Sequence, residues 1–221
     1  MQLVQHSEES DLLSLPATPL AREVFDLVTR NASTVIANHS MRSFLFARLI
    51  AQKRDLTPGR DYDSELLFCA CALHDMGLTQ AYDRSRQRFE VDGADLAAEL
   101  LKRHGVGASD VDLVWQAIAL NTSVGIVERR GTLCALTLAG VSADFGADAA
   151  FIPNDTAELI HRAYPRLAIG RALADAVVAQ AQKEPSKAPL FSMAAQLVRE
   201  RDAAPHVTLI ESIAAASRWR E

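Results

Sequence analysis

An adjacent histidine and aspartate, His74 and Asp75, stand at the end of the most apolar stretch of the chain. The eight residues before them, 66–73, are all apolar, which is typical of a helix buried on every side. Burying an imidazole or a carboxylate without partners costs about 2 to 7 kcal/mol for each uncompensated group. A divalent metal offsets that cost, because both groups ligate such ions. The pattern indicates a metal site, and a helix cap followed by a solvated turn residue is the structural alternative.

Two further residues of suitable type are expected at helix ends. His39 falls in the first turn of a helix predicted to begin near Asn38, and Asp144 follows a second nearly all-apolar helix at 133–141. After each apolar helix, an aspartate is followed two residues later by a glycine. Two imidazoles and two carboxylates suit Zn, Fe or Mn rather than Ca or Mg. The candidate ligands of one transition metal are therefore His39, His74, Asp75 and Asp144.

The other histidines have simpler interpretations. His104 precedes Gly105, which is expected to stop a helix, so this imidazole should cap the helix or face solvent. His161 is expected on a polar helix face, His206 at a helix start, and His6 in an N-terminal arm.

An all-α fold is predicted, because alanine and leucine dominate and the apolar residues recur with helical spacing. Thr18 and Pro19 form a helix start, Asp63 or Ser64 caps the central helix, and Gly77 is expected to end it in a left-handed turn. Residues 80–88 are polar and are predicted to form a loop over the site. The expected helices are 19–31, 38–50, 64–76, 92–104, 109–120, 133–141, 155–164, 167–183, 190–202 and 206–219.

The 221 residues form one large domain or two small ones, with no internal repeat and no clear boundary. We expect a loose N-terminal arm at 1–17, a metal-binding core at 18–150, and a helical extension packed on that core at 151–221.

The composition bounds the partners and the compartment. A net charge of −5 gives no basic surface for nucleic acid, and no apolar run reaches the ~20 residues that span a membrane. The N-terminus is polar and acidic, unlike a signal peptide. The three cysteines, two of them inside the apolar helix, argue for a reducing compartment, so we expect a cytoplasmic protein. A small-molecule substrate is the expected partner, and a homo-oligomer is compatible with the sequence.

Four blocks of residues, in this order along the chain, resemble the HD superfamily of metal-dependent hydrolases and its cyanamide-hydratase-like branch. The resemblance covers about residues 20 to 150, and its blocks are 39–42, 74–79, 88–94 and 117–122. It implies an all-α HD-domain helical bundle with a C-terminal helical extension. It also implies one divalent metal per chain, in the first place Zn and otherwise Fe or Mn, held by the four candidate ligands.

The resemblance further implies a hydrolase or hydro-lyase in which a metal-bound water attacks a small C–N electrophile, such as a nitrile or cyanamide. A bound divalent ion lowers the pKa of its water from 15.7 toward about 7, which provides the nucleophile. Asp75, Glu90 and Asn121 are the expected catalytic residues. The expected substrate contacts are Arg42, Thr79, Phe89 and Thr122.

Two other functions stay open at this point: hydrolysis of nucleotides or phosphomonoesters on the same fold, and a non-catalytic HD protein that binds a metal or ligand. Phosphohydrolases of the superfamily often carry lysine after the motif glycine, where this chain has Leu78. None of its four lysines lies near the motifs, which disfavours phosphate. The chain also departs from many relatives at Asn121, where they have histidine. Asparagine is a poor transition-metal ligand, so this amide is expected to contact substrate or change specificity.

Overall fold

The computed structural model describes residues 11–219, which form helices, short 3-10 turns and connecting segments. The predicted all-α fold is confirmed, because this range contains no β-strand beyond one isolated bridge. None of the helices in this range is long and apolar enough to cross a membrane. The α-helices are α2 Pro19–Asn31, α3 Thr34–Lys53, α4 Ser64–Leu73, α5 Phe89–Arg103, α6 Ala108–Ala119, α7 Thr132–Asp144, α8 Asn154–Ala163, α9 Ile169–Lys183, α10 Met193–Asp202 and α11 Leu209–Ala216.

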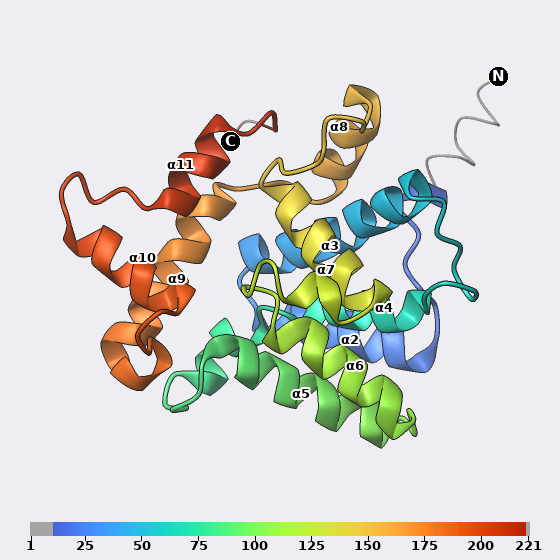
Figure 1. Cartoon of the computed structure of the whole chain (residues 1–221), viewed down its shortest axis with the longest axis horizontal. Coiled ribbons are helices and arrows are strands. Elements are labelled where there is room, and N and C mark those ends of the chain that lie inside the picture. The colour runs from blue at the N-terminus through green and yellow to red at the C-terminus, as the bar shows by residue number, and fades with distance from the viewer. Residues whose placement is uncertain (1–10, 220–221) are drawn as a thin grey trace.

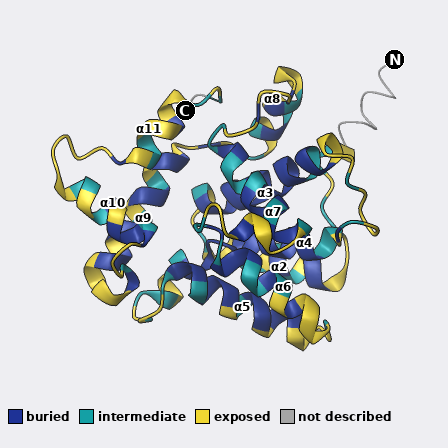
Figure 2. Ribbon diagram, in the orientation of Figure 1, coloured by how far each residue is buried: buried dark blue, intermediate teal, exposed yellow. Residues whose placement is uncertain are grey.

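The core is built where α3, α4 and α7 pack together, with α2, α5 and α6 around them (Figure 1). Figure 2 shows the buried residues concentrated in these crossing helices. Helices α9, α10 and α11 lie to one side and have their own apolar cluster, which includes Ile36 of α3 and Phe89 of α5. The extension therefore contacts the core at the first turns of α3 and α5. A division of the chain at residue 150 stays a prediction.

Part of the predicted N-terminal arm can be described. Leu12, Leu13 and Leu15 pack against the core, and the Arg48 guanidinium donates to the backbone carbonyl of Ser14 at 2.8 Å. Residues 1–10, with His6, lie outside the described range.

The capping residues predicted from the sequence give the correct start for two helices, and for two others they give a start that is several residues too late. The Thr18 side chain accepts from the Ala21 amide before α2, and Asp63 accepts from two amides at the start of α4, both as predicted. The predicted start near Asn38 is wrong: Ser33 caps α3, so His39 lies in the second turn. The predicted cap at Asp92 is also wrong, because α5 begins at Phe89 and Asp92 is buried inside its first turn.

Gly77 does not end the central helix in a left-handed turn as predicted. It lies in a 3-10 turn, η1 Met76–Leu78, and its φ is not positive. A Cβ at this position would lie 2.0 Å from the carbonyl oxygen of Phe89, so only glycine lets the start of α5 approach this turn. That approach places Phe89, the first residue of α5, against the turn that follows Asp75.

The prediction that His161 lies on a polar helix face is wrong. Its ring packs edge-on against Trp219, with ring centroids 5.4 Å apart, and against Phe46 at 6.0 Å. Burial in this aromatic cluster lowers the pKa of His161 to about 4. The three cysteines are buried free thiols.

Candidate metal centre and its cavity

Three side chains from two neighbouring helices converge at one buried point. His39 comes from α3, His74 is the C-cap of α4, and Asp75 follows it directly. The Asp75 Oδ2 atom lies 3.1 Å from His74 Nε2 and 3.8 Å from His39 Nε2. Within residues 11–219, this is the one group of three or more such side chains that could hold a metal ion. Adjacent residues converge here because the helix ends at Leu73, which frees Asp75 from the helical direction.

The polar atoms at this point are left without partners. Both His39 Nε2 and Asp75 Oδ2 are buried and have no hydrogen-bond partner in the part of the chain that is described. The other nitrogens are engaged, since His74 Nδ1 bonds the Cys71 carbonyl at 2.8 Å and His39 Nδ1 bonds Asp144 at 2.7 Å. Metal-binding histidines are typically oriented in this way, with the second ring nitrogen bonded to a carbonyl or carboxylate. The three residues therefore fit a divalent transition metal.

The charges of two members of the group, His39 and Asp75, agree with that fit. Burial lowers the pKa of His39, which favours the neutral imidazole that a metal requires. Burial alone would raise the pKa of Asp75, but the neighbouring His74 and His39 hold it below its ordinary value, so Asp75 is a carboxylate. For His74, burial opposes the charged form, but the Asp75 carboxylate raises its pKa overall.

Asp144, the last residue of α7, stands behind His39. Its Oδ2 accepts from His39 Nδ1 and from Arg42 Nη2, both at 2.7 Å, while Oδ1 accepts from Arg42 Nε at 2.8 Å. Arg166 Nη1 adds a further bond to Oδ1 at 3.0 Å. Burial alone would raise the pKa of Asp144, but Arg42 and His39 hold it far below its usual range. Both oxygens are thus engaged by Arg42, by Arg166 and by the Nδ1 atom of His39, and a ligand role for Asp144 stays a prediction.

A cavity of about 840 Å³ opens from the metal group toward the extension. Next to His39, His74 and Asp75, its polar lining includes Asn121 and Thr122, which follow α6. The Asn121 side chain is 5% exposed, and its Nδ2 has no hydrogen-bond partner among the described residues. This amide is therefore free to bond a molecule in the cavity.

Thr122 is held by a buried carboxylate behind it. Its hydroxyl donates to Glu90 Oε1 at 2.7 Å and accepts from Arg88 Nη2 at 3.0 Å, while Arg88 also ion-pairs with Glu90. Glu90 is 1% exposed and does not line the cavity itself. The network fixes the orientation of the Thr122 hydroxyl.

Of the three remaining predicted substrate contacts, one lines the cavity and two do not. Phe89 lines the cavity, whereas Arg42 and Thr79 lie outside it. The Arg42 guanidinium is fully buried and is committed to Asp144 and to the carbonyls of Tyr164 and Pro165. The Thr79 hydroxyl donates to the Met76 carbonyl at 2.8 Å.

Residues 80–88, predicted to form a loop over the site, are held away from the cavity by the extension. None of them lines it. Instead, the Lys183 ammonium pairs with Asp83 at 2.7 Å, and the buried Lys187 ammonium pairs with Asp92 at 2.6 Å. Gln180 of α9 donates to the Gly77 carbonyl at 3.0 Å. Sequence patterns gave no sign of these three partners, because each lies about 100 residues from the group it bonds.

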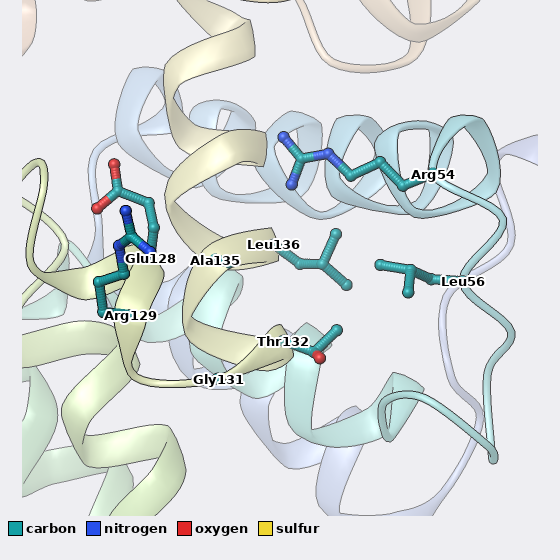
Figure 3. Close-up of a pocket in the computed structure, with 8 residues that line it drawn as sticks. All are labelled: Arg54, Leu56, Glu128, Arg129, Gly131, Thr132, Ala135 and Leu136. Atoms are coloured by element: carbon teal, nitrogen blue, oxygen red, sulfur yellow. The ribbon is translucent and has the colours of Figure 1, made fainter.

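A second hollow, of about 450 Å³, lies at the first turns of α7 and the end of α3 (Figure 3). Arg54, Arg129 and Thr132 are among its lining residues, and none of the three clustered residues contributes to it. The chemistry of the metal group is therefore confined to the larger cavity.

Most of the chain is similar to known proteins. The HD domain family matches residues 36–179 of the chain. Two proteins of Saccharomyces cerevisiae, cyanamide hydratase DDI2 and cyanamide hydratase DDI3, are each 31% identical to it over 157 residues. Each alignment covers 69% of this chain and 68% of the yeast protein. The matched region contains the metal group, Asn121, Thr122 and Asp144 within the family boundaries.

Proposed function

The chain belongs to the HD-domain family and is a metal-dependent hydrolase or hydro-lyase, and from this premise we propose that it adds water to a small, uncharged C–N electrophile of the nitrile or cyanamide type. One observation carries the proposal: the cavity that His39, His74 and Asp75 line is also lined by two neutral hydrogen-bonding residues, Asn121 and Thr122. The arginines nearby are already neutralised, the buried Arg42 by Asp144 and the half-buried Arg88 by Glu90. Such a site suits a neutral substrate better than a phosphate.

His39, His74 and Asp75 would hold one divalent transition metal, with Zn as the first expectation and Fe or Mn as the others. Asp144 completes the predicted set, and in the structure it orients His39 through Nδ1. When bound, such a metal supplies a water whose pKa is lowered toward about 7, and thus a nucleophile at neutral pH.

The chain's own residues orient the electrophile and manage its charge. Negative charge develops on the substrate nitrogen as water adds to the carbon, and the unpartnered Nδ2 of Asn121 would donate to that nitrogen. Asp75 would take the proton that the water loses. Thr122 presents a fixed hydroxyl to the cavity, and the buried Glu90 carboxylate behind it would hold or return a proton at Thr122 Oγ1.

The charge of the cavity lining disfavours the phosphohydrolase alternative. Among the described residues that line the cavity, Arg199 is the one lysine or arginine, and it is exposed on α10. Electrostatic stabilisation of a transferring phosphoryl group needs cations at the reacting end. Here the polar groups that join the metal group in the lining include an amide and a hydroxyl, Asn121 and Thr122.

The proposal is tested with protein reconstituted with Zn, Fe or Mn and given cyanamide, small nitriles and nucleoside monophosphates in parallel. We expect urea or amide to form, with negligible release of phosphate. Release of inorganic phosphate without hydration would assign the chain to the phosphohydrolases. Metal binding without turnover of any panel member would favour the non-catalytic alternative.

Asn121→Ala should lower turnover of the best panel substrate by about 10- to 1000-fold, the range for loss of one positioned hydrogen-bond donor. Metal content should be unchanged, because Asn121 is not one of the three converging residues. Asn121→His should move substrate preference rather than abolish activity, since imidazole also carries a proton near pH 7. Elemental analysis and turnover are measured side by side. Loss of metal in Asn121→Ala would contradict the assigned role.

A further inference from the structure

The cavity is much larger than the smallest substrates of the proposed reaction require. Its volume of about 840 Å³ lies within the range of about 300 to 1,000 Å³ that is typical of sites for drug-sized ligands. Cyanamide has three non-hydrogen atoms, roughly the bulk of two water molecules at about 30 Å³ each, and would fill less than about a tenth of the space. Most of the cavity therefore serves something other than the C–N group.

The core and the extension contribute different kinds of side chain to the lining of the cavity. The core contributes the metal group, Asn121 and Thr122 to the lining, and it also contributes Phe89, Leu138 and Phe145. The extension then adds apolar side chains from α9, α10 and α11, among them Leu173, Leu197 and Ile210. A wall of this kind binds hydrocarbon by removing it from water.

Several large apolar side chains at the outer part of the cavity are exposed. Leu209 is 54% exposed and Ile213 is 45% exposed, although both line the cavity, and Phe191 is 99% exposed. Contiguous exposed apolar surface of this kind marks a binding site on a folded protein. The exposure is continuous with the wall that leads to the metal group, so one elongated ligand could contact both.

Two of the polar residues among these apolar ones, Gln196 and Glu200, are already paired with each other, whereas Arg199 is exposed. Gln196 donates to Glu200 Oε1 at 2.7 Å, and the Leu209 amide donates to Glu200 Oε2 at 2.8 Å. These bonds fix the junction of α10 and α11 and leave the aliphatic side chains directed at the cavity. The outer wall therefore presents mainly apolar side chains, with Arg199 as the one cation among its described residues.

Resting on the proposed function, we propose that the substrate carries an apolar body of several carbons attached to the C–N group. The C–N group lies at the His39, His74 and Asp75 end, and the hydrocarbon lies along α9, α10 and α11. The reaction needs water alone: an N-alkylcyanamide gains one water across its C≡N bond and becomes an N-alkylurea. The two π bonds of the C≡N group break, a C=O bond forms to the water oxygen, and both protons of the water end on the former nitrile nitrogen as NH2.

The experiment compares cyanamide with a series of N-alkylcyanamides from ethyl to octyl on the metal-loaded protein. We expect kcat/KM to rise about threefold to fourfold for each added methylene, the factor that corresponds to about 0.8 kcal/mol of burial, until the chain reaches solvent. Binding of the matching N-alkylureas, measured by calorimetry, should rise with the same dependence on length. This second readout does not depend on turnover.

A matched pair of variants locates the hydrocarbon. Ile213→Asp places a charge in the outer wall and should lower kcat/KM for the octyl compound at least tenfold while leaving cyanamide within twofold. Val207→Asp is the control, because Val207 is similarly exposed, at 51%, lies just before α11 and does not line the cavity. It should leave both substrates unchanged.

The outcomes separate this inference from the proposed function. Turnover of cyanamide with no gain along the series would overturn the inference and leave the proposed function standing. Length-dependent urea binding with no hydration of any member would refute the proposed reaction and support the apolar site. If Ile213→Asp changes the oligomeric state without changing the length dependence, the exposed apolar wall is a contact between copies and the inference fails.

Discussion

His74→Ala is expected to strip the metal from the protein and to lower turnover of the best panel substrate by more than about 1000-fold, because the activated water is lost with the metal. Wild-type protein should hold about one equivalent per chain, since residues 11–219 contain a single suitable group. With His74 absent, only His39 and Asp75 of that group remain. Elemental analysis after reconstitution and turnover on the same sample provide the measurement.

His206→Ala is the matched control for this change. His206 is exposed, and its Nδ1 bonds the Arg201 carbonyl at 2.9 Å far along the chain from the metal group. Metal content and turnover should both stay at the wild-type level. A His74→Ala protein that kept one equivalent of metal would show that the metal lies elsewhere.

Part of the metal group could be predicted from the sequence because the local composition requires His74 and Asp75 to be buried. The apolar run at 66–73 leaves His74 and Asp75 nowhere to lie but in the interior, and the structure buries both at 2% exposure. His39 could be predicted as a candidate ligand but not placed correctly on its helix. Residues 31–34 include several residues that cap helices well, and only the structure shows that Ser33 does so.

The rest of the site depends on partners that are distant in the sequence. In the sequence Asp92 has the pattern of a helix N-cap, but in the structure its carboxylate is buried and pairs with Lys187. No local sequence pattern connects Arg166 with Asp144, to which it donates a hydrogen bond. The outer wall of the cavity also depends on contacts between segments that are distant in the sequence. The apolar residues of α10 and α11 have the spacing of ordinary core-facing helices, and only the packing of the extension on the core turns Leu197 and Ile210 toward a cavity.

For Asp144, the effect of a substitution on stability and its effect on metal affinity can be predicted and measured separately. Asp144→Ala removes the acceptor of Arg42, Arg166 and His39 together and leaves a buried guanidinium uncompensated. Breaking a buried ion pair from one side costs about 3 to 5 kcal/mol, so the metal-free variant should unfold at distinctly lower denaturant concentration. His104→Ala removes only a partly exposed pair with Glu23, and an exposed pair contributes about 0 to 1 kcal/mol.

Metal affinity then distinguishes a ligand from a group that acts through His39. If Asp144 only orients the imidazole through Nδ1, Asp144→Asn should weaken metal binding by about 10- to 100-fold, because the amide still occupies the site but loses the charge. A loss well beyond 100-fold identifies a direct ligand, as the resemblance to the family implies. In both cases Asp144→Ala must weaken binding far more than His104→Ala in a chelator competition titration. Equal affinities for these two alanine variants would remove Asp144 from the site altogether and leave the metal to His39, His74 and Asp75 alone.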